Sequence, residues 1–407
     1  MAGRKRRLRA SPGDEREPYL QMWLALTPAQ RLRRSWRLRT LAILVCVGLG
    51  CGGGDDADLD AAPVLPDAGS FDAPLPDAAP RYTAAEAFSI SEESPGRDED
   101  PHVLAARDGS VFAIWFSDRT GGVDIYLRHS LDGAAWDDPV AVTTGAATDY
   151  YPTLLEDDDG FHASWFRRAG AAAGHVYIKH TTDPADWSAA TEIEVTVPGA
   201  GEADWTPSLA RAASGRLVIA FARDACYPNP QPCFSLWVSA SDDNGASWAT
   251  PAPMVDPAGE QDFLPYLATK DGTVVAVWNR YAATATLPYF TASSDIATAE
   301  STDGLSWSSV VQITNDVGDD ESDVIPMLHP NHDGLWRVLW LHSGVSARVV
   351  EQVYGSGFGA TALDALPSAG YSHHVAPTVT PGVEIGVWVQ PTPITGDLEI
   401  WARVFRR

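Results

Sequence analysis

The chain has 407 residues, with 29 Lys and Arg against 54 Asp and Glu, and a net charge of −25 at pH 7. Residues 1–50 hold 11 basic and 3 acidic residues, so the rest of the chain carries −33. A surface this acidic repels phosphate backbones and argues against nucleic-acid binding. The composition, with 15 Trp, 34 Gly, 30 Pro and only 4 Met, favours a turn-rich β protein over a helical bundle.

The first fifty residues show a pattern typical of export. Residues 31–40 are basic, and residues 41–50 are apolar but too few to span a bilayer as a helix. This order predicts a secretory signal, for which Met1 and Met22 both offer a start. The residues that follow, Gly48-Leu49-Gly50-Cys51, resemble a bacterial lipobox, in which the signal is cut before an acylated cysteine.

We therefore predict a signal segment at 1–50 and a lipidated Cys51 that anchors the protein to the bilayer of a bacterial cell envelope, facing the periplasm or the exterior. The alternative is an ordinary signal cut nearby, with Cys51 an unused thiol. Residues 51–80 are rich in Asp, Ala and Pro and lack Lys and Arg. Such a segment cannot bury a core, so we expect a disordered tether.

Two cysteines remain once Cys46 leaves with the signal and Cys51 is lipidated. Cys226 and Cys233 bracket the turn-prone segment Tyr-Pro-Asn-Pro-Gln-Pro. In an exported protein this pair predicts a disulfide. A metal site is the weaker interpretation, because no His lies nearby in the sequence.

A repeated pattern fills residues 81–407, and three markers define it. The prolines, spaced 51 to 61 residues apart, are Pro101, Pro152, Pro207, Pro265, Pro326 and Pro377. Each is followed by a strand, a turn containing Gly, and a second strand that ends in an aromatic residue. These aromatic residues are Trp115, Trp165, Phe221, Trp278, Trp340 and Trp388.

A second pattern follows the third strand of several repeats. It reads Ser-x-Asp-x-Gly-x-x-Trp at 241–248, is one residue shorter at 130–136 and 301–307, and is degenerate at 181–187. These segments resemble the Asp-box, or BNR, repeats of sialidase-like β-propellers. The resemblance implies turns between third and fourth strands, and it gives no catalytic role to Asp132, Asp243 or Asp303.

Six units of about 50 residues predict an all-β, six-bladed β-propeller of four-stranded antiparallel blades. The last repeat lacks an outer strand, and residues 87–91 match the outer strand of the first repeat at 140–143. We expect this leading segment to close the ring and remove exposed sheet edges. A β-sandwich is the alternative, but it would not explain six phased copies.

Three sets of residues recur on the face where first strands begin and second strands end. Three positions before each Pro stand Asp98, Asp149, Asp204, Asp262, Asp323 and His374. Two positions after the aromatic residue stand Arg167, Arg223 and Arg280 in the second to fourth repeats. The same repeats carry Tyr150, Trp205 and Phe263 two positions before Pro.

Two interpretations of these sets stay open. In the structural one, each Asp holds its own loop and the arginines pair with the Asp residues. In the functional one, arginines and aromatic side chains bind an acidic glycan. Five unpaired carboxylates around one axis would repel each other, and a structural calcium ion would relieve this.

The resemblance to sialidases is weaker at the catalytic motifs. That family carries Phe/Tyr-Arg-Ile-Pro near the start of the propeller, where this chain has Asp98-Glu99-Asp100-Pro101, with Glu99 in the Arg position. The family also uses a Tyr nucleophile with a Glu partner, and Tyr281 and Tyr371 lie near the corresponding face. No motif assigns a catalytic residue.

We therefore expect a tethered, monomeric propeller that binds a glycan or protein ligand without catalysis. The alternative is a sialidase-like exo-glycosidase that acts on acidic glycans.

Overall fold

The structure is a computed structural model, and it describes residues 83–406 apart from 92–95, 171–172, 230–232, 257–259, 282–293, 316–321, 332, 344–347, 356–359, 364, 368–369 and 393–396. Every regular element in the described residues is a β-strand. None of the described residues form a helix long and apolar enough to cross a membrane. The predicted signal segment, Cys51 and tether lie outside the described residues.

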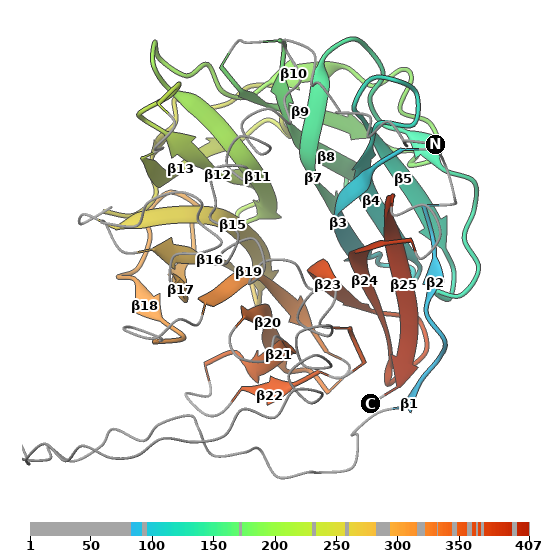
Figure 1. Ribbon diagram of the computed structural model, residues 1–407. Helices are drawn as coiled ribbons and strands as arrows, with labels where there is room; N and C mark the ends of the chain where they lie inside the picture. Colours follow the sequence, from blue (N-terminus) through green and yellow to red (C-terminus); the bar gives the residue numbers. More distant parts are fainter. Residues whose placement is uncertain are drawn as a thin grey trace, which may run out of the picture. The chain divides into compact units, whose positions relative to one another are not determined.

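The strands form six antiparallel sheets arranged as a six-bladed β-propeller, which confirms the predicted fold (Figure 1). Blade one contains β3 (Asp98–Ala105), β4 (Val111–Ser117), β5 (Asp124–Ser130) and β6 (Val140–Ala141). Blade two contains β7 (Thr148–Asp157), β8 (Gly160–Arg168), β9 (His175–Thr181) and β10 (Glu192–Glu194). Blade three contains β11 (Ala203–Arg211), β12 (Leu217–Asp224), β13 (Phe234–Ser241) and β14 (Ala252–Pro253).

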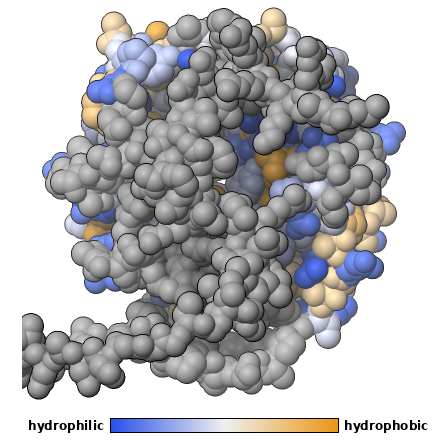
Figure 2. Space-filling model, in the orientation of Figure 1, coloured by the Kyte–Doolittle hydropathy of each residue, from blue (hydrophilic) through white to orange (hydrophobic). Residues whose placement is uncertain are grey.

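Blade four contains β15 (Gln261–Lys270), β16 (Thr273–Tyr281), β17 (Ser294–Ser301) and β18 (Val311–Gln312). Blade five contains β19 (Ser322–Pro330), β20 (Trp336–Ser343), β21 (Arg348–Val353) and β22 (Thr361–Ala362). The innermost strands of the blades surround the centre in Figure 1. Figure 2 shows hydrophilic and hydrophobic residues together in a hollow of the face in view.

Blade six joins the two ends of the described chain. It contains β23 (Tyr371–Pro377), β24 (Val383–Pro391) and β25 (Leu398–Arg406), and both β1 (Thr83–Ala84) and β2 (Phe88–Ser89) pair with β25. Ile90 donates its N–H to the carbonyl of Ile400 at 2.8 Å and is 1% exposed. The predicted closure by residues 87–91 is therefore confirmed, and it covers the edge of β25.

Aromatic side chains fill the spaces between blades. The six predicted aromatic residues at the ends of the second strands are at most 2% exposed, and each belongs to a buried cluster or to the buried core. Second strands such as Val111–Ser117 are buried along their whole length. The continuous apolar sequences of these strands are explained by packing on both faces.

The four turns that resemble Asp-boxes lie between third and fourth strands, as expected. In the turn at 130–136, Asp132 Oδ1 accepts the N–H groups of Ala134 and Ala135 at 2.8 and 3.1 Å. Gly133 has a φ of 79°, and its N–H binds Ser130 Oγ at 2.8 Å. The pattern therefore specifies a tight turn. The likeness to Asp-box repeats stays a resemblance.

The predicted disulfide is present. Cys226 and Cys233 are bonded, with their Cα atoms 5.3 Å apart. Asp224 Oδ1 accepts the N–H groups of both cysteines at 2.9 Å. The disulfide and this carboxylate hold the loop between β12 and β13 at its base.

Each innermost strand has a bulge at the same position. The residue at the bulge has a φ between 47° and 58°, and the six residues are Asp100, Tyr151, Thr206, Leu264, Ile325 and Ser372. In blades one to five the next residue is the marker proline, but in blade six it is His373. The register agrees, because Tyr371 pairs with Val389 as Glu99 pairs with Phe116.

The sequence alignment of blade six was therefore wrong by four residues. Pro377 is not the marker, and Gly370 rather than His374 occupies the Asp position. A Cβ atom added to Gly370 would lie 2.4 Å from Cδ1 of Trp388. Only glycine fits there, which explains why the Asp pattern ends in blade six.

Candidate functional site

The five predicted Asp residues are buried, and each binds a cationic side chain of its own blade. Arg167, Arg223 and Arg280 each grip one carboxylate with two nitrogens at 2.7 to 3.0 Å. The carboxylates belong to Asp149, Asp204 and Asp262. In blade five, His342 Nδ1 lies 2.7 Å from Asp323 Oδ1.

Blades one and six replace this pair in two different ways. In blade one Ser117 stands at the Arg position, and Arg119 reaches back to Ser117 Oγ at 2.8 Å and Asp98 at 3.1 Å. In blade six Gln390 accepts the indole N–H of Trp388 at 2.9 Å. Asp98 accepts the corresponding N–H of Trp115 at 3.1 Å. In blades one and four the carboxylate therefore also holds the inter-blade tryptophan, since Asp262 accepts the N–H of Trp278 at 2.7 Å.

Each of the three guanidinium groups is engaged by an Asp, a Glu and an aromatic ring. Arg223 lies over the ring of Trp237 at 4.2 Å, and Arg167 lies over that of Tyr177 at 4.8 Å. Arg280 also contacts Glu260 at 2.9 Å. Burial raises the pKa of the Asp149 and Asp204 carboxyls, and the arginine hydrogen bonds oppose this rise. These observations support the structural interpretation of the Asp and Arg sets.

The three predicted aromatic residues pack against the preceding blade. Trp205 stacks on Phe166 with centroids 4.5 Å apart, and Phe263 stacks on Phe234 at 4.4 Å. Tyr150 meets the edge of Phe116 at 4.9 Å. Each ring therefore packs between two blades, which supports the structural interpretation of the aromatic set.

His374 lies in the centre of the propeller. Its ring is 5.5 Å from His102 and 5.7 Å from Tyr266, and these two are 5.6 Å apart. Since the three residues come from blades six, one and four, they close the axis. Burial lowers the pKa of His102 to about 4 and that of His374 well below its usual value. Both imidazoles are therefore neutral and part of the packing near neutral pH.

A different group of polar side chains lies where blades six and one meet. We call Arg97, Glu99, Asp100, Tyr371 and Ser372 the seam cluster. Arg97 Nε lies 2.9 Å from Glu99 Oε1, and the Tyr371 phenol interacts electrostatically with the Glu99 carboxylate. Ser372 Oγ is 3.5 Å from Asp100 Oδ1. The side chains of Arg97 and Glu99 are 31% and 16% exposed, so the cluster reaches the surface.

Burial and neighbouring charges shift the pKa values of the titratable groups in the seam cluster. Burial and the neighbouring charge of Glu99 raise the pKa of Asp100 to about 8, so this carboxyl is protonated at neutral pH. Burial and the charges of Glu99 and Asp100 raise the pKa of Tyr371. Burial also raises the pKa of Glu99, and the charge of Arg97 opposes this rise. The cluster thus brings together two carboxyl groups and a phenol, which are groups used in acid–base and nucleophilic catalysis.

The sequence contained the members of this cluster but not their association. Glu99 departs from the Arg of the sialidase motif, and Tyr371 is a tyrosine on the corresponding face. Because the sequence repeat of blade six was aligned four residues too late, the equivalence of Tyr371 and Glu99 in adjacent blades could not be recognised. The φ-positive bulge, which needs no proline, was the signal that sequence reading missed.

The described residues include no group of three His, Cys, Asp or Glu side chains arranged to hold a metal ion. The Asp carboxylates do not suit a shared calcium ion, because each already binds an arginine or histidine. Calcium stays a prediction from the sequence.

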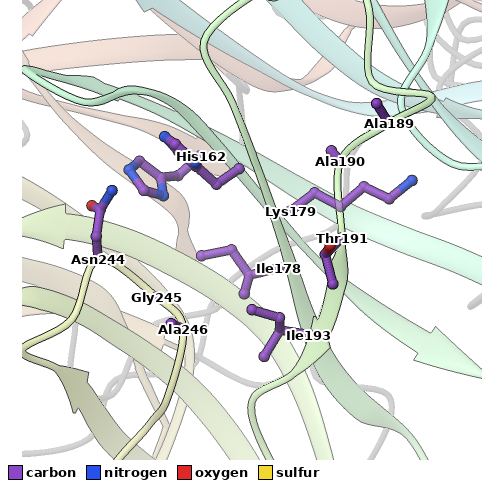
Figure 3. Close-up of a pocket in the computed structure, with 11 residues that line it drawn as sticks. His162, Ile178, Lys179, Ala189, Ala190, Thr191, Ile193, Asn244, Gly245 and Ala246 are labelled. Atoms are coloured by element: carbon purple, nitrogen blue, oxygen red, sulfur yellow. The ribbon is translucent and has the colours of Figure 1, made fainter.

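A cavity of about 330 Å³ lies away from the axis, between blade two and the turn at 244–246 of blade three (Figure 3). His162 lines it and is held by Asp157, with His162 Nε2 2.8 Å from Asp157 Oδ2. Lys179 lines it too, but donates its Nζ hydrogen to the carbonyl of Val142 at 2.9 Å. Thr191 also lines the cavity, but no carboxyl group does, so we place the candidate site at the seam cluster.

No family model and no curated protein matches the sequence. Solved structures do match. A protein of unknown function from Dyadobacter fermentans has a TM-score of 0.62 at 14% identity, covering 81% of this chain and 100% of that one. The Penicillium chrysogenum α-L-arabinanase, solved with arabinobiose, has a TM-score of 0.58 at 14% identity, covering 79% and 98%.

A leech intramolecular trans-sialidase has a TM-score of 0.51 at 13% identity, covering 75% of this chain and 67% of that one. The chain shares the β-propeller fold of these proteins. Identities this low show the fold alone, so any activity has to be argued from the site.

Proposed function

We propose that this protein is a glycoside hydrolase that binds a glycan over the seam cluster and cleaves a glycosidic bond there. The observation that carries the proposal is the seam cluster itself, where the Arg97–Glu99 ion pair lies beside Tyr371 and Asp100. The pKa of Asp100, about 8, keeps this carboxyl protonated at neutral pH. The fold shared with an arabinanase and a trans-sialidase supports it.

Each group has one role in this proposal. The Asp100 carboxyl donates its proton to the glycosidic oxygen as the bond to the anomeric carbon breaks. The Tyr371 oxygen attacks that carbon and passes its proton to Glu99. Water then cleaves the glycosyl–tyrosine bond: the Asp100 carboxylate takes the proton from water, and Glu99 returns its proton to the leaving Tyr371 oxygen. Arg97 positions Glu99 through their ion pair.

A second candidate is glycan binding without catalysis. It is favoured by the position of Glu99, which stands where the sialidase motif has Arg, and by its ion pair with Arg97 at 2.9 Å. A carboxylate held this way can accept hydrogen bonds from sugar hydroxyls without further chemistry.

Turnover of a panel of p-nitrophenyl glycosides separates these two functions. Tyr371→Phe and Asp100→Asn are each expected to lower kcat/KM by at least about 1,000-fold, because they remove the nucleophile and the acid. Tyr177→Phe, outside the cluster, serves as the matched control and should retain full activity. Wild-type activity should fall as pH rises through about 8, since Asp100 then loses the proton it must donate.

Full activity in Tyr371→Phe would contradict the assignment. Glycan binding by a wild-type protein that turns over no glycoside would establish the second candidate in its place.

We also propose that the protein is an exported lipoprotein held by acylated Cys51 through the tether at 51–80. The disulfide supports export, because such bonds persist in oxidising compartments. Labelled fatty acid should be incorporated into the wild-type protein in a bacterial host and not into Cys51→Ser. Equal labelling of both would rule out lipidation at Cys51.

A further inference from the structure

We infer that the seam cluster takes sugars without a carboxylate and discriminates against sialic and uronic acids. This inference rests on the proposed function and reverses what the resemblance to sialidases implies about the substrate. It follows from the charges around the cluster and from the engagement of the arginines in blades one to four.

The seam cluster has an excess of negative charge. The Arg97 guanidinium interacts electrostatically with Glu99, Asp118 and Asp100. Three carboxyl groups therefore lie around one guanidinium. The Arg97 Nε contacts Glu99 at 2.9 Å, and the Arg97 Cζ atom lies 5.1 Å from the centroid of Phe116.

The other arginines near this face in blades one to four are also engaged. Arg119 binds Asp98, Ser117 and the carbonyl of Ser91, all within 3.1 Å. Arg167 and Arg280 each hold an Asp with two nitrogens and contact a further glutamate with the third, which is Glu192 or Glu260.

Arg223 does the same with Asp204 and, at 3.4 Å, Glu202. To gain a bidentate partner among these four arginines, a substrate carboxylate would have to displace a buried aspartate, which leaves the displaced charge unpaired.

The size of the effect follows from Coulomb's law. A substrate carboxylate about 5 Å from one uncompensated carboxylate, at an effective dielectric constant of about 20, is disfavoured by about 100-fold. A hydroxymethyl group at the same position carries no such penalty. The site should therefore distinguish sugars that differ only in this group.

Matched pairs of p-nitrophenyl glycosides test the inference, for example a glucoside against the glucuronide and a galactoside against the galacturonide, with a sialoside as a third arm. We expect kcat/KM to favour the neutral member by about 100-fold at low ionic strength, and by less in 0.5 M salt because screening weakens the repulsion. Asp118→Asn removes one carboxylate beside Arg97, so it should reduce the ratio by several-fold.

Preference for the carboxylated member, or a ratio near one, would overturn the inference and leave the proposed function standing. Where no pair is turned over, the corresponding methyl glycosides are compared by calorimetry, and the same ratio of Kd values decides. Absence of both turnover and binding for every sugar would instead reject the proposed function, and the inference with it.

Discussion

Replacing Arg223 by methionine is expected to lower the free energy of unfolding by about 3–5 kcal/mol. Arg223 is 7% exposed and Asp204 is fully buried, and two hydrogen bonds of 2.7 and 2.9 Å join them. Methionine keeps most of the apolar contact with Trp237 but leaves the Asp204 carboxylate without its cation. Urea denaturation of the two proteins at pH 7 measures the difference.

Arg216 provides the matched control. It grips Asp242 with two nitrogens at 2.7 and 3.0 Å, but the Asp242 side chain is 73% exposed. Because solvent screens this pair, Arg216→Met should leave the unfolding midpoint unchanged within error. Equal midpoints for wild type and Arg223→Met would contradict the structural role of the buried pairs. The double variant Arg223→Met/Asp204→Asn should have a higher free energy of unfolding than Arg223→Met alone, because the amide leaves no unpaired buried charge.

Deleting residues 83–91 is expected to cost about 5 kcal/mol or more of unfolding free energy. This segment buries Ile90 and packs Phe88 against the core between blades six and one. It also makes backbone hydrogen bonds to Val404 and Ile400, both at 2.8 Å. Burial of two large apolar side chains and loss of these hydrogen bonds account for the estimate.

The deletion also exposes the edge of β25, so the variant should aggregate on heating, which light scattering detects. The matched control removes nine residues, 60–68, from the predicted tether and should unfold at the wild-type temperature. If the variant without residues 83–91 unfolds at the same temperature as the wild type, the closing strands do not stabilise the propeller.

The fold was predictable because its signals repeat. Turns with positive φ at Gly109, Gly215 and Gly272 recur in phase with buried aromatic second strands. The closure by residues 87–91 followed from counting strands, since six blades of four strands required one more at the start of the chain. Physical periodicity of this kind survives in a single sequence.

The site was harder to predict, because it depends on what breaks the repeat. Pro377 matched the marker spacing, yet the bulge of blade six lies at Ser372 and is followed by His373. The Asp and Arg sets were conspicuous because they repeat, and the structure shows them paired within each blade. The seam cluster appears once, at Glu99 and Tyr371, and depends on the register between blades that are far apart in sequence.

A crystal structure with bound sugar tests the central claim most directly. The protein to use is Glu99→Gln, soaked with the glycoside that the wild type turns over or binds best. We predict that the sugar lies over Asp100 and Tyr371, with its anomeric carbon near the Tyr371 hydroxyl. Sugar bound instead in the cavity between blades two and three, beside His162 and Lys179, would contradict the assignment of the site.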